Sequence, residues 1–279
     1  MGECAEKERM TMAEKIFYKY LGLHGIKTLC EGRFLISSPT KYWSLERDRR
    51  ELSDPNECKP QLSGSFSQET VDKLFPGVDA AGYSKFLIAN FNKVFAAPDT
   101  LDGFLRILCL CDPEQKSDTD AHMWKTYAKN FRGLRLGIKI DVSDDLTALT
   151  RDYYGQYVRY CNASNLLDAT AILDMRKLGD MAFDVVFKKR KKYDIESEYR
   201  LLMVLDEQGK FSQNVVRDGE RDFWNFPKDS IVSFDLGCDM PVDVRSRLIR
   251  CYKEQYFSVH RITMAAFRDG RVVYEQINV

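Results

Sequence analysis

The most informative pattern in the chain is the change from charged to apolar residues in the segment YDIESEYRLLMVLDE, residues 193–207. Side chains alternate across a strand, so an extended segment places Glu196, Glu198 and Arg200 on one face and Tyr199 on the other. Beyond Arg200 both faces are apolar, which is typical of a central strand covered on both sides. We expect the charged start of this strand to open into a cleft at one end of a sheet.

The rest of the hydrophobic pattern predicts an α+β fold. Alternating or short continuous apolar runs predict the other strands, and apolar residues three and four apart predict helices. The expected strands are 15–21, a strand ending at Pro39, 103–112, 134–141, 156–161, 230–237 and two final strands joined at Asp269-Gly270. The expected helices are 25–32, 82–95, 117–133, 165–192 and 240–257. This order favours a mixed, mostly antiparallel sheet flanked by helices.

The length of 279 residues is enough for one large domain with a substantial core, and we expect a single domain over 1–279. Residues 43–82 are polar and contain three prolines. They predict a long irregular insertion, a kind of loop that often acts as a lid or binding loop.

The composition of the chain limits which partners and which cell compartment are expected. The 42 basic and 42 acidic residues cancel, so no global field attracts nucleic acid or an anionic membrane. The local basic runs RDRR and KKRKK permit nucleic acid without requiring it, and KKRKK also fits a solvated helix end. The polar start lacks the apolar core of a signal peptide, and no apolar run approaches the ~20 residues that cross a bilayer. The eight scattered cysteines fit a reducing compartment. These features predict a cytoplasmic protein without a membrane partner.

The charged start of the 193–207 segment is the main candidate for chemistry. Residues two apart on a strand lie about 7 Å apart, so two carboxylates there can contact different parts of one small ligand. Each raises the pKa of the other unless a cation compensates, and Arg200 is placed to do so. A plain row of ion pairs at a strand end fits the same residues.

Other common chemistries lack their motifs. Cys109 and Cys111 share a strand face, but no second Cys or His pair has ligand spacing, so buried thiols are expected and no metal. No Gly-x-Ser-x-Gly, P-loop or Gly-x-Gly-x-x-Gly motif follows a predicted strand. Serine hydrolases, nucleoside triphosphatases and Rossmann dehydrogenases are therefore disfavoured.

Several short motifs occur in a fixed order along the chain. They are Lys19-Tyr20, Ser38-Pro39, Trp124-x-x-Tyr127-Ala128 with Gly133, Val158-x-Tyr160 and Glu196-x-Glu198-Tyr199-Arg200. Together they resemble a large bacterial family of uncharacterised domains. One departure is that the family usually has Asn-Asp-Pro soon after the second strand, whereas Asp54-Pro55 is shifted here.

At the level of the fold, the same order is similar to the ADP-ribosyltransferase plan, including the DarT-like toxins that modify nucleic acid. This resemblance implies NAD as a substrate and Glu198 as the carboxylate that stabilises charge at the ribose. Glu196 would orient or deprotonate the acceptor, and Arg200 would keep the carboxylates ionised or contact a phosphate.

The resemblance also implies a set of NAD-binding residues. Lys19 or Tyr20 would clamp the dinucleotide, with Ser37 and Ser38 as hydrogen-bond donors. Trp124 and Tyr127 lie three apart on one helix and would either stack on the nicotinamide or pack in the core. The expected cofactor-binding residues are therefore Lys19, Tyr20, Ser37, Ser38, Trp124 and Tyr127.

The resulting hypothesis is a toxin or phage-defence effector that cleaves NAD and transfers ADP-ribose to RNA, DNA or protein. Such a toxin would have an antitoxin or chaperone partner. One alternative is a metal-dependent nuclease in which Glu196, Glu198 and an acid such as Asp184 hold Mg²⁺. The other is a sensor or partner-binding module without catalysis.

Overall fold

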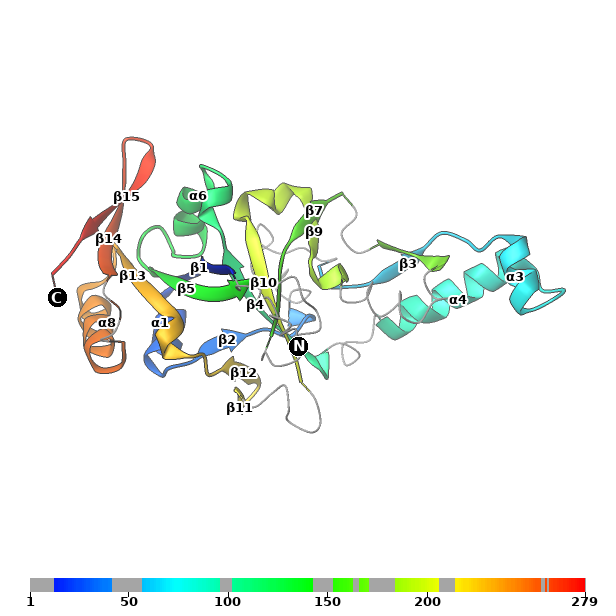
Figure 1. Cartoon of the computed structure of the whole chain (residues 1–279), viewed down its shortest axis with the longest axis horizontal. Coiled ribbons are helices and arrows are strands. Elements are labelled where there is room, and N and C mark those ends of the chain that lie inside the picture. Colours follow the sequence, from blue (N-terminus) through cyan, green and yellow to red (C-terminus); the bar gives the residue numbers. More distant parts are fainter. Residues whose placement is uncertain are drawn as a thin grey trace, which may run out of the picture.

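A computed structural model of the chain describes residues 13–41, 57–95, 102–142, 153–162, 166–170, 184–205, 214–256, 259 and 261–278. Its central feature is an eight-stranded sheet with the order β15-β14-β13-β5-β1-β4-β10-β6 (Figure 1). Every neighbouring pair is antiparallel except β13 and β14. The predicted mixed, mostly antiparallel sheet is confirmed. The strands are β1 (Ala13–Leu21), β4 (Leu105–Cys111), β5 (Leu134–Val142), β6 (Tyr154–Tyr157), β10 (Glu198–Val204), β13 (Ile231–Gly237), β14 (Arg261–Arg268) and β15 (Arg271–Gln276).

Helices cover both faces of this sheet. On one face lie α1 (Leu23–Cys30) and α8 (Val242–Gln255), which pack against a core that includes Phe17, Leu201 and Phe234. A small sheet of β11 (Val215–Asp218), β12 (Arg221–Trp224) and β2 (Phe34–Ile36) adjoins the same core. On the opposite face lies α6 (Thr119–Thr126), which contributes Trp124 to a second cluster. The central strands are therefore apolar on both sides, as the pattern after Arg200 predicts.

The predicted helix over 165–192 is wrong for most of its described residues, of which only 184–186 are α-helical. Residues Leu166–Asp168 form β8, which pairs in parallel with β3 (Gln61–Ser63), and Lys188–Arg190 form β9, which pairs in parallel with β7 (Arg159–Cys161). Lys191–Glu196 form the 3-10 helix η4. The basic run KKRKK is therefore part of a strand and a 3-10 helix, not the end of an α-helix. Short strands whose partners are distant in sequence can mimic a helical apolar spacing; residues 171–183 lie outside the described ranges.

The predicted irregular insertion at 43–82 also contains regular structure in its described part. Besides β3 it holds α3 (Gln68–Leu74), and α4 (Ala80–Phe95) begins before its end. Ser67 caps α3 by accepting a hydrogen bond from the Thr70 amide at 3.2 Å. These elements extend to the right in Figure 1. The predicted helix over 82–95 corresponds to α4, whereas polar composition concealed β3 and α3, of which α3 buries only Val71. Residues 42–56 are not among those described.

The sheet diverges between β1 and β4. Strand β1 pairs with β5 at nine positions but with β4 only at Tyr18, opposite Cys111. Farther along the same edge of β4, Ser37 forms a bridge with Ile107. Between these two points the Lys19 ammonium donates a hydrogen bond to the Cys109 carbonyl at 2.6 Å. A lysine side chain thus occupies the place where a continuous ladder would have backbone pairing.

Candidate functional site

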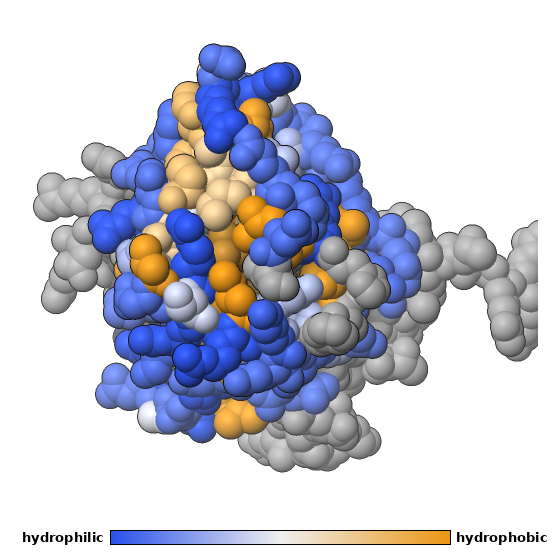
Figure 2. All heavy atoms as spheres, turned by 90° about the vertical axis from the view of Figure 1, so that its left-hand side faces the viewer, coloured by the Kyte–Doolittle hydropathy of each residue, from blue (hydrophilic) through white to orange (hydrophobic). Residues whose placement is uncertain are grey.

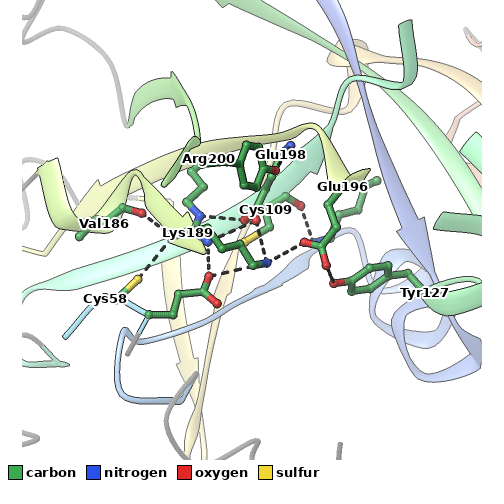
Figure 3. A network of polar contacts seen from close by, with 11 residues as sticks. Cys58, Cys109, Tyr127, Val186, Lys189, Glu196, Glu198 and Arg200 are labelled. Carbon is green, nitrogen blue, oxygen red and sulfur yellow. Dashed lines mark hydrogen bonds and ion pairs between the residues drawn. The ribbon is translucent and has the colours of Figure 1, made fainter. Parts of the chain in front are cut away.

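The two glutamates of the Glu-x-Glu segment do not lie on one strand, which corrects the prediction. Ser197 has φ 43° and ψ 52°, a left-handed conformation, so Glu196 ends η4 and Glu198 begins β10. The change of direction nevertheless brings both carboxylates to one cation. The Lys189 Nζ lies 2.6 Å from Glu196 Oε2 and 3.1 Å from Glu198 Oε2 (Figure 3).

Arg200 holds the other side of Glu198. Its Nε donates to Glu198 Oε1 at 2.8 Å and its Nη2 to Oε2 at 3.2 Å, a bidentate arrangement. The same guanidinium also contacts the carboxylate of Glu57 and the carbonyl of Val186. Arg200 and Glu198 share a strand face with Leu202, while Tyr199 and Leu201 face the opposite core, as alternation predicts.

Two members of this site were not predicted. Glu57 pairs with Arg200, and its Oε1 lies 3.9 Å from the Lys189 Nζ, which is therefore surrounded by three carboxylates. Lys189 stands in the run KKRKK, where it looked like one of several solvated cations. Its position becomes evident only once β9 is paired with β7, and Glu57 follows a segment with no recognisable pattern. We call Glu57, Lys189, Glu196, Glu198 and Arg200 the ionic cluster.

The cluster sets the charge of Glu198. Burial alone would raise the pKa of this carboxyl, but the guanidinium of Arg200 and the ammonium of Lys189 outweigh burial and hold the pKa well below its usual range. For Glu57 burial dominates, and its pKa is raised. Burial would lower the pKa of Lys189, yet the surrounding carboxylates raise it. Glu198 is therefore ionised at neutral pH and suited to stabilise positive charge rather than to accept a proton.

The members of the predicted aromatic pair, Trp124 on α6 and Tyr127 at its C-cap, lie in two different environments. The Tyr127 hydroxyl donates to Glu196 Oε1 at 2.9 Å and so joins the cluster. Trp124 is fully buried, its ring stacked on Phe131 with centroids 5.1 Å apart, and its Nε1 donates to the Tyr274 hydroxyl at 2.9 Å. Of the two alternatives for this residue, Trp124 therefore packs in the core of the protein.

The remaining predicted residues lie on or near β1 and β2. Burial lowers the pKa of Lys19, although Cys109 and Glu198 partly offset this effect by attracting its charge. The Tyr20 hydroxyl donates to Asp120, away from the cluster. Ser37 exchanges backbone hydrogen bonds with Ile107.

Ser38, next in the chain, accepts a hydrogen bond from the Lys41 amide through its carbonyl. The structure thus brings Lys19 and Tyr127 to the ionic cluster, whereas the described contacts of Tyr20, Ser37, Ser38 and Trp124 are elsewhere.

The three carboxylates of the cluster surround an ammonium. In the described part of the chain, no group of three or more His, Cys, Asp or Glu side chains is arranged to hold a metal ion. Asp184, the third acid of the nuclease alternative, pairs with Arg159 and Lys188. The cation between the carboxylates is supplied by the protein itself.

Comparisons with protein-family models, with curated proteins and with solved structures give no significant match to this chain. The resemblance to an uncharacterised bacterial family and to the ADP-ribosyltransferase plan therefore stays a prediction. Among the described helices, none has both the length and the apolar character needed to cross a membrane.

Proposed function

We propose that the chain is an ADP-ribosyltransferase that cleaves NAD at the start of β10. The observation that carries this proposal is the position of Glu198. It begins a central strand, is fixed by Lys189 and Arg200, and lies on β10, next to the strand β4 from which β1 diverges. A rigid carboxylate near the place where two strands of the sheet diverge fits a reaction that develops positive charge on a sugar.

The chemistry matches the roles the residues can take. When the bond between the ribose C1′ and the nicotinamide nitrogen breaks, its electron pair leaves with nicotinamide and C1′ becomes oxocarbenium-like. A preorganised anion stabilises that charge, which is the role we assign to Glu198. An acceptor group then bonds to C1′ and releases a proton. Glu196, oriented by Tyr127 and Lys189, is the carboxylate we assign to take that proton.

The proposal requires the cluster to open to its ligand. Glu196 is 4% exposed and Glu198 is 5% exposed. The Glu198 amide also donates to the Tyr160 hydroxyl at 2.9 Å, so the end of the Tyr160 side chain contacts the start of β10. Binding of NAD must therefore displace side chains that cover the carboxylates, and we expect binding to be slower than a simple collision.

The acceptor that we propose is nucleic acid. Lys191 and Lys192 are exposed on η4, the element that ends at Glu196. Lysines at that place can pair with phosphates close to the proposed reaction centre. We also propose the role of a toxin or phage-defence effector for the whole protein, and with it a requirement for an antitoxin or chaperone.

The test is to incubate the protein with NAD labelled in the adenosine part, together with RNA, DNA and protein, and to measure released nicotinamide and transferred label. Wild type is compared with Glu198→Gln and with the matched control Glu57→Gln. Both variants remove a buried carboxylate that pairs with Arg200. Only Glu198 is assigned to the sugar, so we expect turnover to fall about 100-fold or more in Glu198→Gln and much less in Glu57→Gln.

Other outcomes separate the alternatives. Nucleic-acid cleavage that needs a divalent metal and is lost in Glu198→Gln would support the nuclease. Absence of both nicotinamide release and cleavage, in a protein that still folds, would leave a binding module and would contradict the proposal. Thermal unfolding of each variant confirms that the compared proteins are folded.

A further inference from the structure

The outer edge of β15 is an exposed edge of the large sheet to which the proposed function assigns no role. β15 is the last strand of the large sheet, and no described strand pairs with its outer edge. It follows β14 through a two-residue turn in which Asp269 and Gly270 both have positive φ, 49° and 79°. These values fit a type I′ turn, which confirms the hairpin predicted from Asp-Gly. The hairpin presents a regular strand with one side of its backbone unpaired by any strand in the described ranges.

The register shows which backbone groups point outward. The Ile277 amide donates to the Ile262 carbonyl, so pairs of β15 and β14 residues in phase with this one exchange hydrogen bonds. Alternation then directs the amide and carbonyl groups of Val272, Tyr274 and Gln276 away from β14. These three residues offer a further strand a ladder of donors and acceptors.

The face of the molecule around this edge carries apolar side chains. Figure 2 looks onto this end and shows apolar side chains gathered in its middle with hydrophilic ones around them. Phe267 on β14 is 43% exposed and Val242 at the start of α8 is 76% exposed. Val272 and Val273 are partly exposed on the edge strand itself.

The charges on β15 are self-complementary. Arg271 and Glu275 lie on one face, two residues on either side of Val273. Within the hairpin Arg271 lies opposite Arg268, and Glu275 pairs with Arg268. Like charges directly opposite each other destabilise a sheet, and no described residue forms an ion pair with Arg271. An antiparallel copy of β15 centred on Val273 would place its Glu275 opposite Arg271 at both ends.

We propose that two copies of this chain associate through antiparallel pairing of their β15 strands about a twofold axis at Val273. In this register Val272 and Tyr274 of opposite copies form a hydrogen-bonded pair, using the backbone groups that point outward. Val273 meets Val273 of the second copy, and Arg271 meets Glu275, at the non-hydrogen-bonded positions where side chains are closest. The contact is isologous, so it closes at two copies and joins their sheets into one.

A backbone test uses Val272→Pro with Val272→Ala as its control. Proline removes the outward amide, which a free edge strand tolerates, whereas alanine removes side-chain volume but keeps the donor. Because the substitution is present in both copies, Val272→Pro removes two hydrogen bonds per dimer. We therefore expect the dissociation constant of the dimer to rise about tenfold or more in this variant. Sedimentation equilibrium of the full chain, 32.4 kDa per copy, measures the dissociation constants of the two variants.

A charge test examines the register. Arg271→Glu and Glu275→Arg alone each place like charges opposite each other and weaken the dimer. The double variant restores opposite charges across the twofold axis, and the new Glu at 271 also lies opposite Arg268. We therefore expect the double variant to regain most of the wild-type affinity.

A crosslinking test examines the axis. Val273→Cys places two thiols at a distance that a disulfide spans, whereas Val272→Cys does not, because its opposite residue is Tyr274. Peptide mapping distinguishes a 273–273 crosslink from one that involves native cysteines. A chain that is monomeric up to about 100 μM would overturn the proposal. It would also be overturned by a dimer that Val272→Pro leaves intact, or by charge swaps that do not rescue each other.

Discussion

Three glutamates, one lysine and one arginine are buried together in the ionic cluster, and their pairing decides what each can do. Buried ion pairs add little net stability compared with apolar residues of the same size, because each charge loses its water. Removal of one partner is costly, about 3–5 kcal/mol, because it leaves an unpaired buried charge. The bidentate pair of Arg200 and Glu198 makes this cost highest at the residue we propose to act on the sugar.

Lowering the pH should remove the contribution of Glu198 to stability. Its folded pKa lies below the unfolded value of about 4.3, because Arg200 and Lys189 outweigh burial. The ionised form therefore stabilises the folded state, fully at neutral pH and progressively less as pH falls below about 5. We expect the difference in unfolding free energy between wild type and Glu198→Gln to be largest near pH 7 and to shrink towards pH 3. Urea titrations across this range measure it.

A difference that stays constant from pH 7 to pH 3 would contradict this prediction, since Glu198 would then contribute through packing alone. Glu57→Gln serves as the comparison. Burial raises the folded pKa of Glu57, so its ionised form does not stabilise the fold in the same way. The difference in unfolding free energy between wild type and Glu57→Gln should therefore not shrink as pH falls, whereas the difference for Glu198→Gln should.

At this scale three of the five members of the ionic cluster, Glu196, Glu198 and Arg200, could be predicted from the sequence. Alternation along a strand correctly grouped Glu198 with Arg200, because residues two apart on a strand need no long-range information. Glu57 lies 143 positions from Arg200 and meets it only through the tertiary fold. Lys189 could not be predicted because a run of five cationic residues indicates a solvent-exposed segment. Nothing in the local sequence distinguishes the one lysine of the run that is buried.

At the scale of elements, the junction between η4 and β10 is what brings the two glutamates together. Ser197 turns the chain by adopting a left-handed conformation, which costs a non-glycine residue about 1–2 kcal/mol. Its hydroxyl lies 3.1 Å from the Thr119 hydroxyl, and Thr119 donates to the Ile195 carbonyl. The start of α6 thereby fixes the turn, and the sequence gives no sign of it because serine is common in extended and helical segments alike.

Substitution of Ser197 should separate the strain of its left-handed conformation from the contribution of its hydroxyl contact with Thr119. Glycine relieves the left-handed strain of about 1–2 kcal/mol but loses the hydroxyl contact, worth about 1 kcal/mol, so we expect Ser197→Gly to change the unfolding free energy by no more than about 1 kcal/mol. Alanine loses the contact and keeps the strain, so Ser197→Ala should destabilise by about 1–2 kcal/mol. Chemical denaturation of both variants checks the order. An alanine variant at least as stable as the glycine variant would show that the turn is not strained.

At the scale of the whole molecule, the sheet is predictable as a class but not as a topology. Periodicity located β1, β4, β5, β10 and β13, because each is long and buried. The predicted strand over 156–161 is in fact two strands, β6 and β7, which belong to different sheets. The parallel pairs β3–β8 and β7–β9 consist of three-residue strands whose partners lie far away in sequence, so no local pattern marks their pairing. The divergence of β1 from β4 also could not be predicted, since it depends on where a long-range ladder stops.

Lys19 lies where β1 and β4 diverge, and its replacement tests whether this divergence serves a ligand or only the fold. Its ammonium donates to the Cys109 carbonyl and has no ion-pair partner within 4.0 Å among the described residues, and burial lowers its pKa. Lys19→Met keeps the length of the side chain and removes a charge that is costly to bury. We therefore expect the unfolding free energy to change by less than about 1 kcal/mol. If Lys19 contacts a phosphate of NAD, loss of one charge-assisted hydrogen bond, about 1.5–3 kcal/mol, should raise the KM for NAD at least tenfold.

Steady-state release of nicotinamide and urea denaturation of the same preparations give both quantities. The control is Lys139→Met on the neighbouring strand β5, where the lysine is exposed and paired with Glu14. That variant should leave both quantities unchanged, because surface ion pairs contribute little. A Lys19→Met protein that loses more than about 2 kcal/mol of stability while its KM stays constant would make Lys19 a structural tie between β1 and β4. The opposite result, stable protein with weakened NAD binding, is expected if the sheet diverges at β1 to admit a dinucleotide.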